Sequence, residues 1–136
     1  MATAVFSIDR FLKAPPLSRI REMEEGLPVG ALRAVADGKV VTLADLVGIV
    51  GTRRTLDRRM AEDGRLSLKE SDRLARFAET LALATHVLGD RAHAMEWLRT
   101  PKHRLDGARP LELMRTYSGG DLVVNLLNLA RHGMLA

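Results

Sequence analysis

Residues 97–133 decide the fold. They comprise Trp97-Leu98-Arg99-Thr100-Pro101, then Leu105-Asp106-Gly107-Ala108-Arg109-Pro110-Leu111-Glu112-Leu113-Met114, and then a helical run from Asp121 to Gly133. Thr100-Pro101 is expected to stop one helix, because proline disfavours helical backbone at the residue before it. Leu105-Asp106-Gly107 predicts a turn. Pro110 suits the first position of the next helix, where its missing N–H would have been unpaired anyway.

The segment after Pro110 predicts a short helix over residues 110–117 and a final helix that starts at Asp121. Gly119-Gly120 is expected to end the short helix in the left-handed conformation common at helix ends, and Asp121 favours the next start through free backbone N–H groups. Gly133 is expected to close the final helix. The predicted buried stripe of that helix comprises Leu122, Val123, Leu126, Leu127 and Ala130.

Composition narrows the class of protein. The chain has 136 residues, 46% hydrophobic and 28% charged, which suffices for one compact core or two small helical units. Aromatic content of 4% and a shortage of alternating apolar runs argue against a sheet protein, so we predict an all-α fold. No cysteine is present, and no apolar stretch nears the roughly 20 residues of a membrane span. We expect a cytoplasmic protein without a signal peptide or membrane segment.

The first part of the chain predicts an arm followed by two short helices. Residues 1–16 are expected to form an N-terminal arm, because Pro15 and Pro16 block helix continuation and favour an extended link. Helices are expected over about 17–25 and 29–36, closed by Gly26-Leu27-Pro28 and Asp37-Gly38.

Residues 42–60 predict a helix-turn-helix, within a domain that we place over residues 17–73. Thr42 can cap a helix whose inward positions are Leu43, Leu46 and Val47. The run Gly48-Ile49-Val50-Gly51 supplies the turn, and Thr52 is expected to cap the second helix.

The positive charge of the chain, +4 in total, is concentrated on this second helix. From Thr52 to Arg76 there are eight basic and five acidic residues, and four of the basic ones lie between Arg53 and Arg59. A recognition helix presents such groups to bases and phosphates of DNA. The alternative is an ordinary solvated face, since Asp57 and Glu62 interrupt the basic residues. The candidate DNA-binding residues are Arg53, Arg54, Thr55, Arg58 and Arg59.

A long helix is expected to follow the basic segment and to join the two halves of the chain. Ser67 with Glu70 fits a capping box, and one helical stripe is kept by Leu74, Phe77, Ala78, Leu81, Thr85 and Leu88. This helix is expected to end at Gly89. Asp90 is then expected to cap a helix that carries Ala94, Trp97 and Leu98 inward.

Both halves of the chain resemble one protein family, the Xre/MbcA/ParS antitoxins. The segments Thr52–Arg59 and Leu66–Leu74 look like the Xre-like helix-turn-helix half of these proteins. The chain departs from the family pattern at Asp106, Arg109, Met114 and His132, where glycine, threonine, leucine and tyrosine are usual. The residues that match the pattern typical of the family's toxin-binding domain are Trp97-Leu98, Pro101, Leu105, Gly107, Pro110-Leu111, Gly119, Val123 and Gly133.

The resemblance implies an antitoxin of a type II toxin–antitoxin module. Its C-terminal domain, residues 74–136, would bind a RES-type toxin that consumes NAD, and its N-terminal half would bind operator DNA. Family members form dimers or larger complexes with the toxin. We expect the tail Met134-Leu135-Ala136 to enter the NAD site of the toxin. The toxin-contacting residues that we expect are Trp97, Arg99, Arg131, His132, Gly133, Met134, Leu135 and Ala136.

Other classes of function remain to be weighed. A free-standing helix-turn-helix regulator whose C-terminal half only dimerises is the alternative, and a neighbouring gene for an NAD-consuming protein would favour the antitoxin. We expect no enzyme, because no nucleophile–histidine–acid arrangement appears and Gly48–Gly51 lacks the lysine of a phosphate-binding loop. We expect neither a cofactor nor a metal, since His86 and His93 lack a third ligand in sequence reach.

Overall fold

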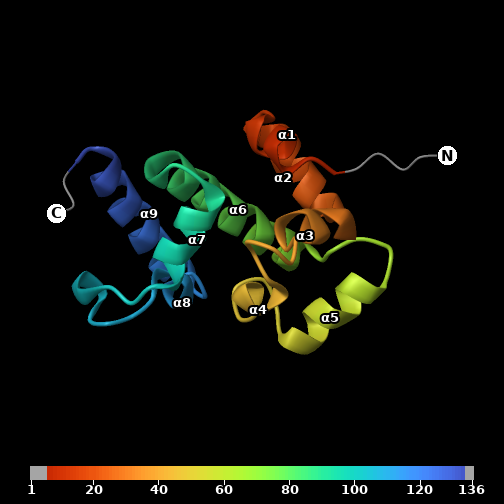
Figure 1. Cartoon of the computed structure of the whole chain (residues 1–136). Helices are drawn as coiled ribbons and strands as arrows, with labels where there is room; N and C mark the ends of the chain where they lie inside the picture. Colours follow the sequence, from red (N-terminus) through yellow and green to blue (C-terminus); the bar gives the residue numbers. More distant parts are fainter. Residues whose placement is uncertain (1–5, 134–136) are drawn as a thin grey trace. The chain divides into compact units, whose positions relative to one another are not determined.

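The structure, a computed structural model, describes residues 6–133. Over these residues the chain forms nine α-helices, one 3₁₀ turn and two isolated β-bridges, with no strand (Figure 1). The prediction of an all-α fold is therefore confirmed for the described part of the chain.

The chain divides into two compact units, Met1–Arg76 (unit 1) and Phe77–Ala136 (unit 2). The division falls inside the longest helix, as does the predicted boundary between residues 73 and 74. The helices are α1 (Ile8–Lys13), α2 (Pro16–Glu25), α3 (Val29–Val35), α4 (Leu43–Leu46), α5 (Arg53–Ala61), α6 (Leu68–Leu88), α7 (Arg91–Arg99), η1 (His103–Leu105), α8 (Pro110–Leu113) and α9 (Tyr117–Arg131).

The segment predicted to be an arm contains helix α1, so that expectation is wrong for residues 8–13. The side-chain oxygen of Ser7 accepts a hydrogen bond from the N–H of Arg10, which caps the helix. Phe11 is buried, and its ring lies 5.9 Å from that of Phe6. The prolines act only locally: Ala14 and Pro15 are extended, and Pro16 begins the next helix.

Helix α2 ends where the chain passes close to the segment that precedes α6. Gly26 has a φ of +89°, and a Cβ there would overlap the carbonyl oxygen of Leu66. The N–H of Leu66 donates to the carbonyl oxygen of Leu27 (2.8 Å), and the N–H of Leu27 donates to the hydroxyl of Ser71 (2.9 Å). These bonds satisfy polar groups that burial would otherwise leave unpaired, and they attach the link between α2 and α3 to the start of α6.

The predicted helix-turn-helix is present as α4, a turn and α5. Thr42 forms a capping box with Asp45 at the start of α4. Gly48 turns the chain with a φ of +83°. Ile49 and Val50 are buried at 5% and 1% exposure, so the turn also contributes two core residues that the sequence pattern assigned only to a connection.

Helix α6 matches its prediction. The side chains and backbone N–H groups of Ser67 and Glu70 cap each other (2.8 and 3.1 Å), as the sequence pattern indicates. With 21 residues it is the longest helix of the described chain, and it contributes residues 68–76 to unit 1 and 77–88 to unit 2. The predicted stripe is confirmed as buried at Leu74, Phe77, Ala78 and Leu81, whereas Thr85 and Leu88 at the end of the helix are only half-buried.

The beginning of unit 2 also follows its sequence signals. Asp90 caps α7 by accepting the N–H of His93 (2.8 Å). Asp106 adopts the left-handed conformation with a φ of +54°, and Gly107 follows with a φ of +84°. Pro110 occupies the first position of α8, as expected from its missing N–H.

The boundary between the last two helices differs from the prediction. α8 ends at Leu113 and α9 begins at Tyr117, because the hydroxyl of Thr116 accepts the N–H of Gly119 (3.0 Å) and caps the helix. Gly119-Gly120 therefore lies in the first turn of α9 and does not end α8, and Asp121 does not start the helix.

The buried stripe of α9 is narrower than predicted. Val123, Leu126 and Leu127 are buried, as expected, whereas Leu122 is 45% exposed. Val123 and Leu127, four residues apart, and Leu126 define one face of the helix, and Leu122 lies toward its edge. The expectation that Leu122 is core is wrong.

Candidate functional site

Helix α5 is fixed to unit 1 by one face and exposed along the other. Leu56 is buried, and the helix contacts α3 and α4. The hydroxyl of Thr52 accepts the N–H of Thr55 (3.1 Å), which confirms the predicted cap. The same hydroxyl donates to the hydroxyl of Thr55 (3.0 Å), so Thr55 takes part in the cap. The start of α5 is thereby held in place.

Three of the predicted DNA-binding arginines lie on the exposed side of α5. Arg53 pairs with Asp57 across one helical turn, with Nε 3.2 Å from the carboxylate. Arg54 and Arg58 are also one turn apart and exposed. Within residues 6–133 the side chains of Arg54 and Arg58 have no ion pair or hydrogen bond. These two guanidinium groups are thus the ones on α5 with all their donors available to an anionic ligand.

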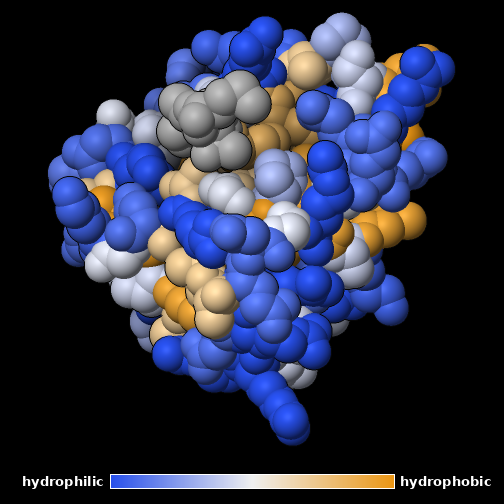
Figure 2. Space-filling view, turned by 90° about the vertical axis from the view of Figure 1, so that its right-hand side faces the viewer, coloured by the Kyte–Doolittle hydropathy of each residue, from blue (hydrophilic) through white to orange (hydrophobic). Residues whose placement is uncertain are grey.

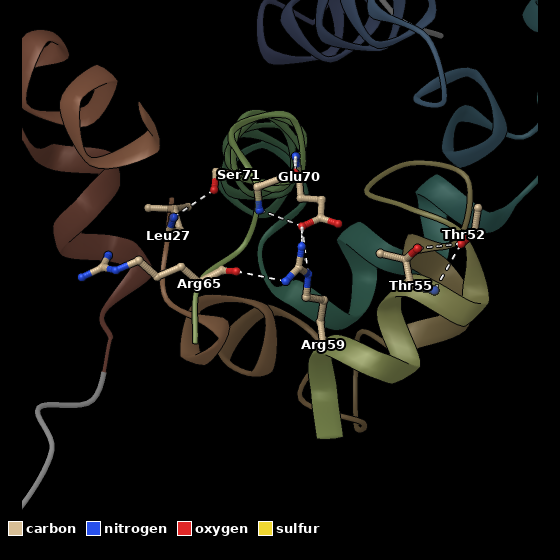
Figure 3. Close-up of polar contacts among 8 residues, drawn as sticks. Leu27, Thr52, Thr55, Arg59, Arg65, Glu70 and Ser71 are labelled. Carbon is tan, nitrogen blue, oxygen red and sulfur yellow. Dashed lines mark hydrogen bonds and ion pairs between the residues drawn. The ribbon is translucent and has the colours of Figure 1, made fainter. Parts of the chain in front are cut away.

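Arg59, the fifth predicted DNA-binding residue, has a different environment. Its Nε donates to Glu70 Oε1 (3.1 Å), Nη2 lies 3.0 Å from the same oxygen, and Nη1 donates to the carbonyl oxygen of Arg65 (3.2 Å; Figure 3). The side chain of Arg59 is 24% exposed and that of Glu70 is 12% exposed. Arg59 therefore links the end of α5 to the start of α6.

Sequence reasoning identified Glu70 as a capping residue but missed its contact with Arg59. Its Oε1 accepts a hydrogen bond from the N–H of Ser67 (2.8 Å), and the same oxygen accepts the hydrogen bond from Arg59 Nε (Figure 3). The capping-box pattern predicts the first contact, but the second joins residues eleven apart in sequence and has no local signal. One carboxylate thus holds α5, α6 and the loop between them together.

The Arg59–Glu70 pair should contribute to stability. Arg59→Ala and Glu70→Ala are each expected to lower the free energy of unfolding by about 1 to 2 kcal/mol, because each leaves a partly buried charged or polar partner without its hydrogen bonds. Urea denaturation followed by circular dichroism measures the loss. Arg53→Ala is the matched control. The Arg53–Asp57 pair is exposed, so its loss should lower the free energy of unfolding by less than about 0.5 kcal/mol. Equal losses for Arg53→Ala and Arg59→Ala would contradict the assignment.

Hydrophilic residues cover most of the face of the molecule drawn in Figure 2, which is the right-hand side of Figure 1, and hydrophobic residues form only separate smaller areas there.

In unit 2, Trp97 and Arg99 lie in the last turns of α7 and are half-buried. The ammonium group of Lys102 sits 4.8 Å from the centre of the Trp97 ring, a distance at which cation and ring attract. Burial lowers the pKa of Lys102 below its ordinary value. Sequence reasoning did not single out Lys102, because no local pattern places it over a ring. Trp97 is thus neither fully core nor fully exposed.

The remaining predicted partner-contacting residues lie elsewhere in unit 2. Arg131, His132 and Gly133 are exposed at the end of α9. Helix α9 has 15 residues and is therefore about 22 Å long, so these three residues lie far from the start of the helix. The start of α9 lies beside α8 and comes, in the chain, after α7, the helix that carries Trp97 and Arg99 (Figure 1). The predicted residues thus form two separate groups. Met134, Leu135 and Ala136 lie outside the described residues.

The histidines considered for metal binding lie apart from any ligand cluster. His93 pairs with Asp90, with Nδ1 2.7 Å from the carboxylate, and this hydrogen bond raises the pKa of His93. In the described residues no three His, Asp or Glu side chains come together in a way that could hold a metal ion. Residues 6–133 also include no helix of the length and apolarity that a membrane crossing requires.

Two protein-family models match the chain. Residues 18–79 match the antitoxin Xre-like helix-turn-helix domain, and residues 83–133 match the antitoxin Xre/MbcA/ParS C-terminal toxin-binding domain. The first match includes α4 and α5 with the basic face. The second includes α7 to α9.

Three curated relatives, each named antitoxin Xre, are similar to this chain. The protein from Photorhabdus laumondii is 29% identical over 116 residues, which is 84% of this chain and 78% of the relative. Those from Pseudomonas putida and Yersinia enterocolitica are 39% and 34% identical over 74 and 84 residues, or 54% and 61% of this chain. The chain spans only about half the length of these two (46% and 57%).

Proposed function

Because the chain belongs to the Xre/MbcA/ParS antitoxin family, and is thus an antitoxin of a toxin–antitoxin system, we propose that it neutralises a RES-type, NAD-consuming toxin and represses its own operon. Unit 2 is the part that binds the toxin, and α5 is the part that binds the operator. The observation that carries the proposal is the presence, in one chain, of a match to a toxin-binding domain and a helix-turn-helix whose Arg54 and Arg58 have no partner within residues 6–133.

Operator binding is supported by the side chains on the outer face of α5. Arg54 and Arg58 are exposed one turn apart, with no partner in the described chain, and arginine is the residue that best pairs with phosphate or with the edge of guanine. Arg53 shares its charge with Asp57, and Arg59 is held by Glu70. We therefore assign the strongest DNA contacts to Arg54 and Arg58, a smaller one to Arg53, and none to Arg59.

Toxin binding is supported by side chains that unit 2 leaves exposed. Leu122 and Leu129 are 45% and 37% exposed and lie seven residues apart, which places them on one face of α9. Arg131 and His132 follow at the end of the same helix. An apolar pair beside basic groups suits a protein partner with an acidic rim. The group around Trp97 and Lys102 offers a second contact.

We keep the proposal that residues 134–136 enter the NAD site of the toxin, which makes them necessary for full inhibition. Co-expression of the full chain with the toxin encoded beside it is expected to restore growth, and the chain lacking residues 134–136 is expected to bind the toxin but to restore growth poorly. Growth curves and copurification measure the two effects. Full protection by the shortened chain would reject tail insertion while leaving toxin binding intact.

A further inference from the structure

Lys102 is a cation that the fold partly buries without giving it an anion. Its side chain is half-buried, and its ammonium group lies 4.8 Å from the centre of the Trp97 ring. Within residues 6–133 no carboxylate forms an ion pair with this ammonium group, and no oxygen accepts a hydrogen bond from it. An ammonium group has three N–H donors, and its charge is costly to remove from water unless an anion is close.

The loop that carries Lys102 is closed by its own backbone hydrogen bonds. The N–H of Lys102 donates to the carbonyl oxygen of Ala108, and the N–H of Gly107 donates back to the carbonyl oxygen of Lys102 (both 3.0 Å). The N–H of Leu105 donates to that same carbonyl oxygen (3.0 Å). These bonds fix the backbone of residue 102, so the place of its side chain over Trp97 is built into the fold and little further ordering is needed to bind a partner.

Glu96, the acidic residue that precedes Trp97 on α7, does not neutralise Lys102. Its charge favours the ammonium form, but burial has the larger effect, and the pKa of Lys102 lies below its ordinary value. The ring of Trp97 attracts the cation but carries no charge that could neutralise it. The loss of water around the ammonium group is therefore only partly offset within the described part of the chain, and a carboxylate from a partner would offset the rest.

Trp97 supplies the apolar part of the same surface. It is the single tryptophan of the chain, and its side chain is half-buried, so part of the ring remains open to a partner. Tryptophan rings and charged groups that are shielded from water contribute strongly to protein interfaces. An ion pair at Lys102, beside this ring, would be partly shielded, and salt screens such a pair less than an exposed one. The two residues together suit an acidic side chain on an otherwise apolar segment.

We propose that Lys102 is a specificity-determining residue that pairs with an aspartate or glutamate side chain of the toxin, while the open part of the Trp97 ring packs against the same toxin segment. This inference rests on the proposed function, because its occupant is the toxin, and the match of residues 83–133 to a toxin-binding domain includes both residues. A toxin with a neutral side chain at that place would leave Lys102 desolvated and unpaired, so the contact discriminates against it.

Titration calorimetry of the full chain with the toxin encoded beside it measures this contact. Lys102→Met keeps an apolar chain over the ring and removes the charge, and it is expected to raise the dissociation constant at least about tenfold. Lys102→Arg keeps both the charge and the contact with the ring, so it is expected to raise the constant by less than about threefold. Arg104→Met is the matched control. Arg104 is exposed in the same loop and has no partner within residues 6–133, so its loss is also expected to cost less than about threefold.

The outcomes separate this contact from the proposed function. Absence of toxin binding by the unaltered chain would overturn both. Toxin binding that Lys102→Met and Arg104→Met leave equally strong, or weaken equally, would overturn the role of Lys102 and leave the proposed function standing. If Lys102→Met instead weakens operator binding in the absence of toxin and leaves toxin binding unchanged, the lysine contacts DNA, and the proposal is wrong.

The single tryptophan allows a readout that needs no variant. Fluorine-labelled tryptophan incorporated into the chain gives one fluorine NMR resonance, which reports on the ring of Trp97. This resonance is expected to shift when unlabelled toxin saturates the chain, because the toxin segment covers the ring. An unchanged resonance in the saturated complex would show that the toxin does not reach Trp97 and would overturn the proposal. This readout also covers the case in which Lys102→Met disturbs the loop.

Discussion

Gly119→Ala is expected to lower the free energy of unfolding of unit 2 by about 3 kcal/mol. A Cβ at Gly119 would overlap the carbonyl oxygen of Leu113, which belongs to the backbone and cannot rotate away as a side chain would. To relieve the overlap, α8 and α9 would have to separate, and the cap that joins Thr116 to the N–H of Gly119 (3.0 Å) would be disturbed. The position thus demands glycine because of a close approach of two backbones.

Gly120→Ala is the matched control for this variant. Within residues 6–133 no atom outside the nearby backbone of α9 itself lies within 4 Å of a Cβ at Gly120, and the residue is helical, so alanine is expected to stabilise α9 by about 0.5 to 1 kcal/mol. Urea denaturation followed by the fluorescence of Trp97, the single tryptophan of the chain, reports on unit 2. Similar midpoints for the two variants would contradict the close approach of α8 and α9.

Arg54→Ala is expected to weaken operator binding by about 1 to 3 kcal/mol, and the variant with both Arg54→Ala and Arg58→Ala by more. Both guanidinium groups are exposed and unpaired in the described chain, so their removal costs no contact within the folded protein. The effect should therefore appear in DNA affinity and leave both the unfolding free energy and toxin binding unchanged. Fluorescence anisotropy with the operator of the toxin–antitoxin operon, at several salt concentrations, measures it.

The salt dependence distinguishes the kinds of contact. Loss of a phosphate contact reduces the slope of log affinity against log salt by about one, whereas loss of a base contact lowers affinity and relaxes specificity at one position. Lys13→Ala, an exposed basic residue at the end of α1, is the charge-matched control and should leave affinity nearly unchanged. If Lys13→Ala and Arg54→Ala weaken binding equally, the basic face of α5 is not the DNA contact.

Local sequence signals predict the parts of this fold in which a few neighbouring residues determine the backbone conformation. Thr52, the Ser67–Glu70 pair, Asp90 and Pro110 each act through the N–H groups of the next turn, and each predicted helix start is observed. The pattern of α6 predicts the helix and its buried positions as far as Leu81, because the stripe repeats over several turns, and Thr85 and Leu88 beyond it are half-buried.

Tertiary contacts explain the failures. Gly119-Gly120 has the composition of a segment that ends a helix. Gly119 nevertheless lies inside α9, because the carbonyl oxygen of Leu113 comes so close that no residue with a Cβ would fit. Ile49 and Val50 look like turn residues between two glycines, yet both are buried. Residues 8–13 show no periodicity long enough to identify a helix, and the contact of α1 with α3 fixes it.

The sequence predicts which residues form the candidate DNA surface but not which of its arginines are already paired within the fold. The sequence groups four arginines within Arg53–Arg59 and cannot tell which are free. Asp57 is a local partner, four residues from Arg53, whereas Glu70 reaches Arg59 from the next helix. Only the fold separates an arginine that joins two helices from two that remain available.

Titration of purified toxin with the purified full chain, with NAD consumption as the readout, measures toxin neutralisation itself. NAD consumption is expected to fall to the background level as a stable complex forms, and Arg54→Ala is expected to inhibit as well as the unaltered chain. Undiminished NAD consumption at saturating chain, with or without a complex, would show that the chain does not neutralise the toxin.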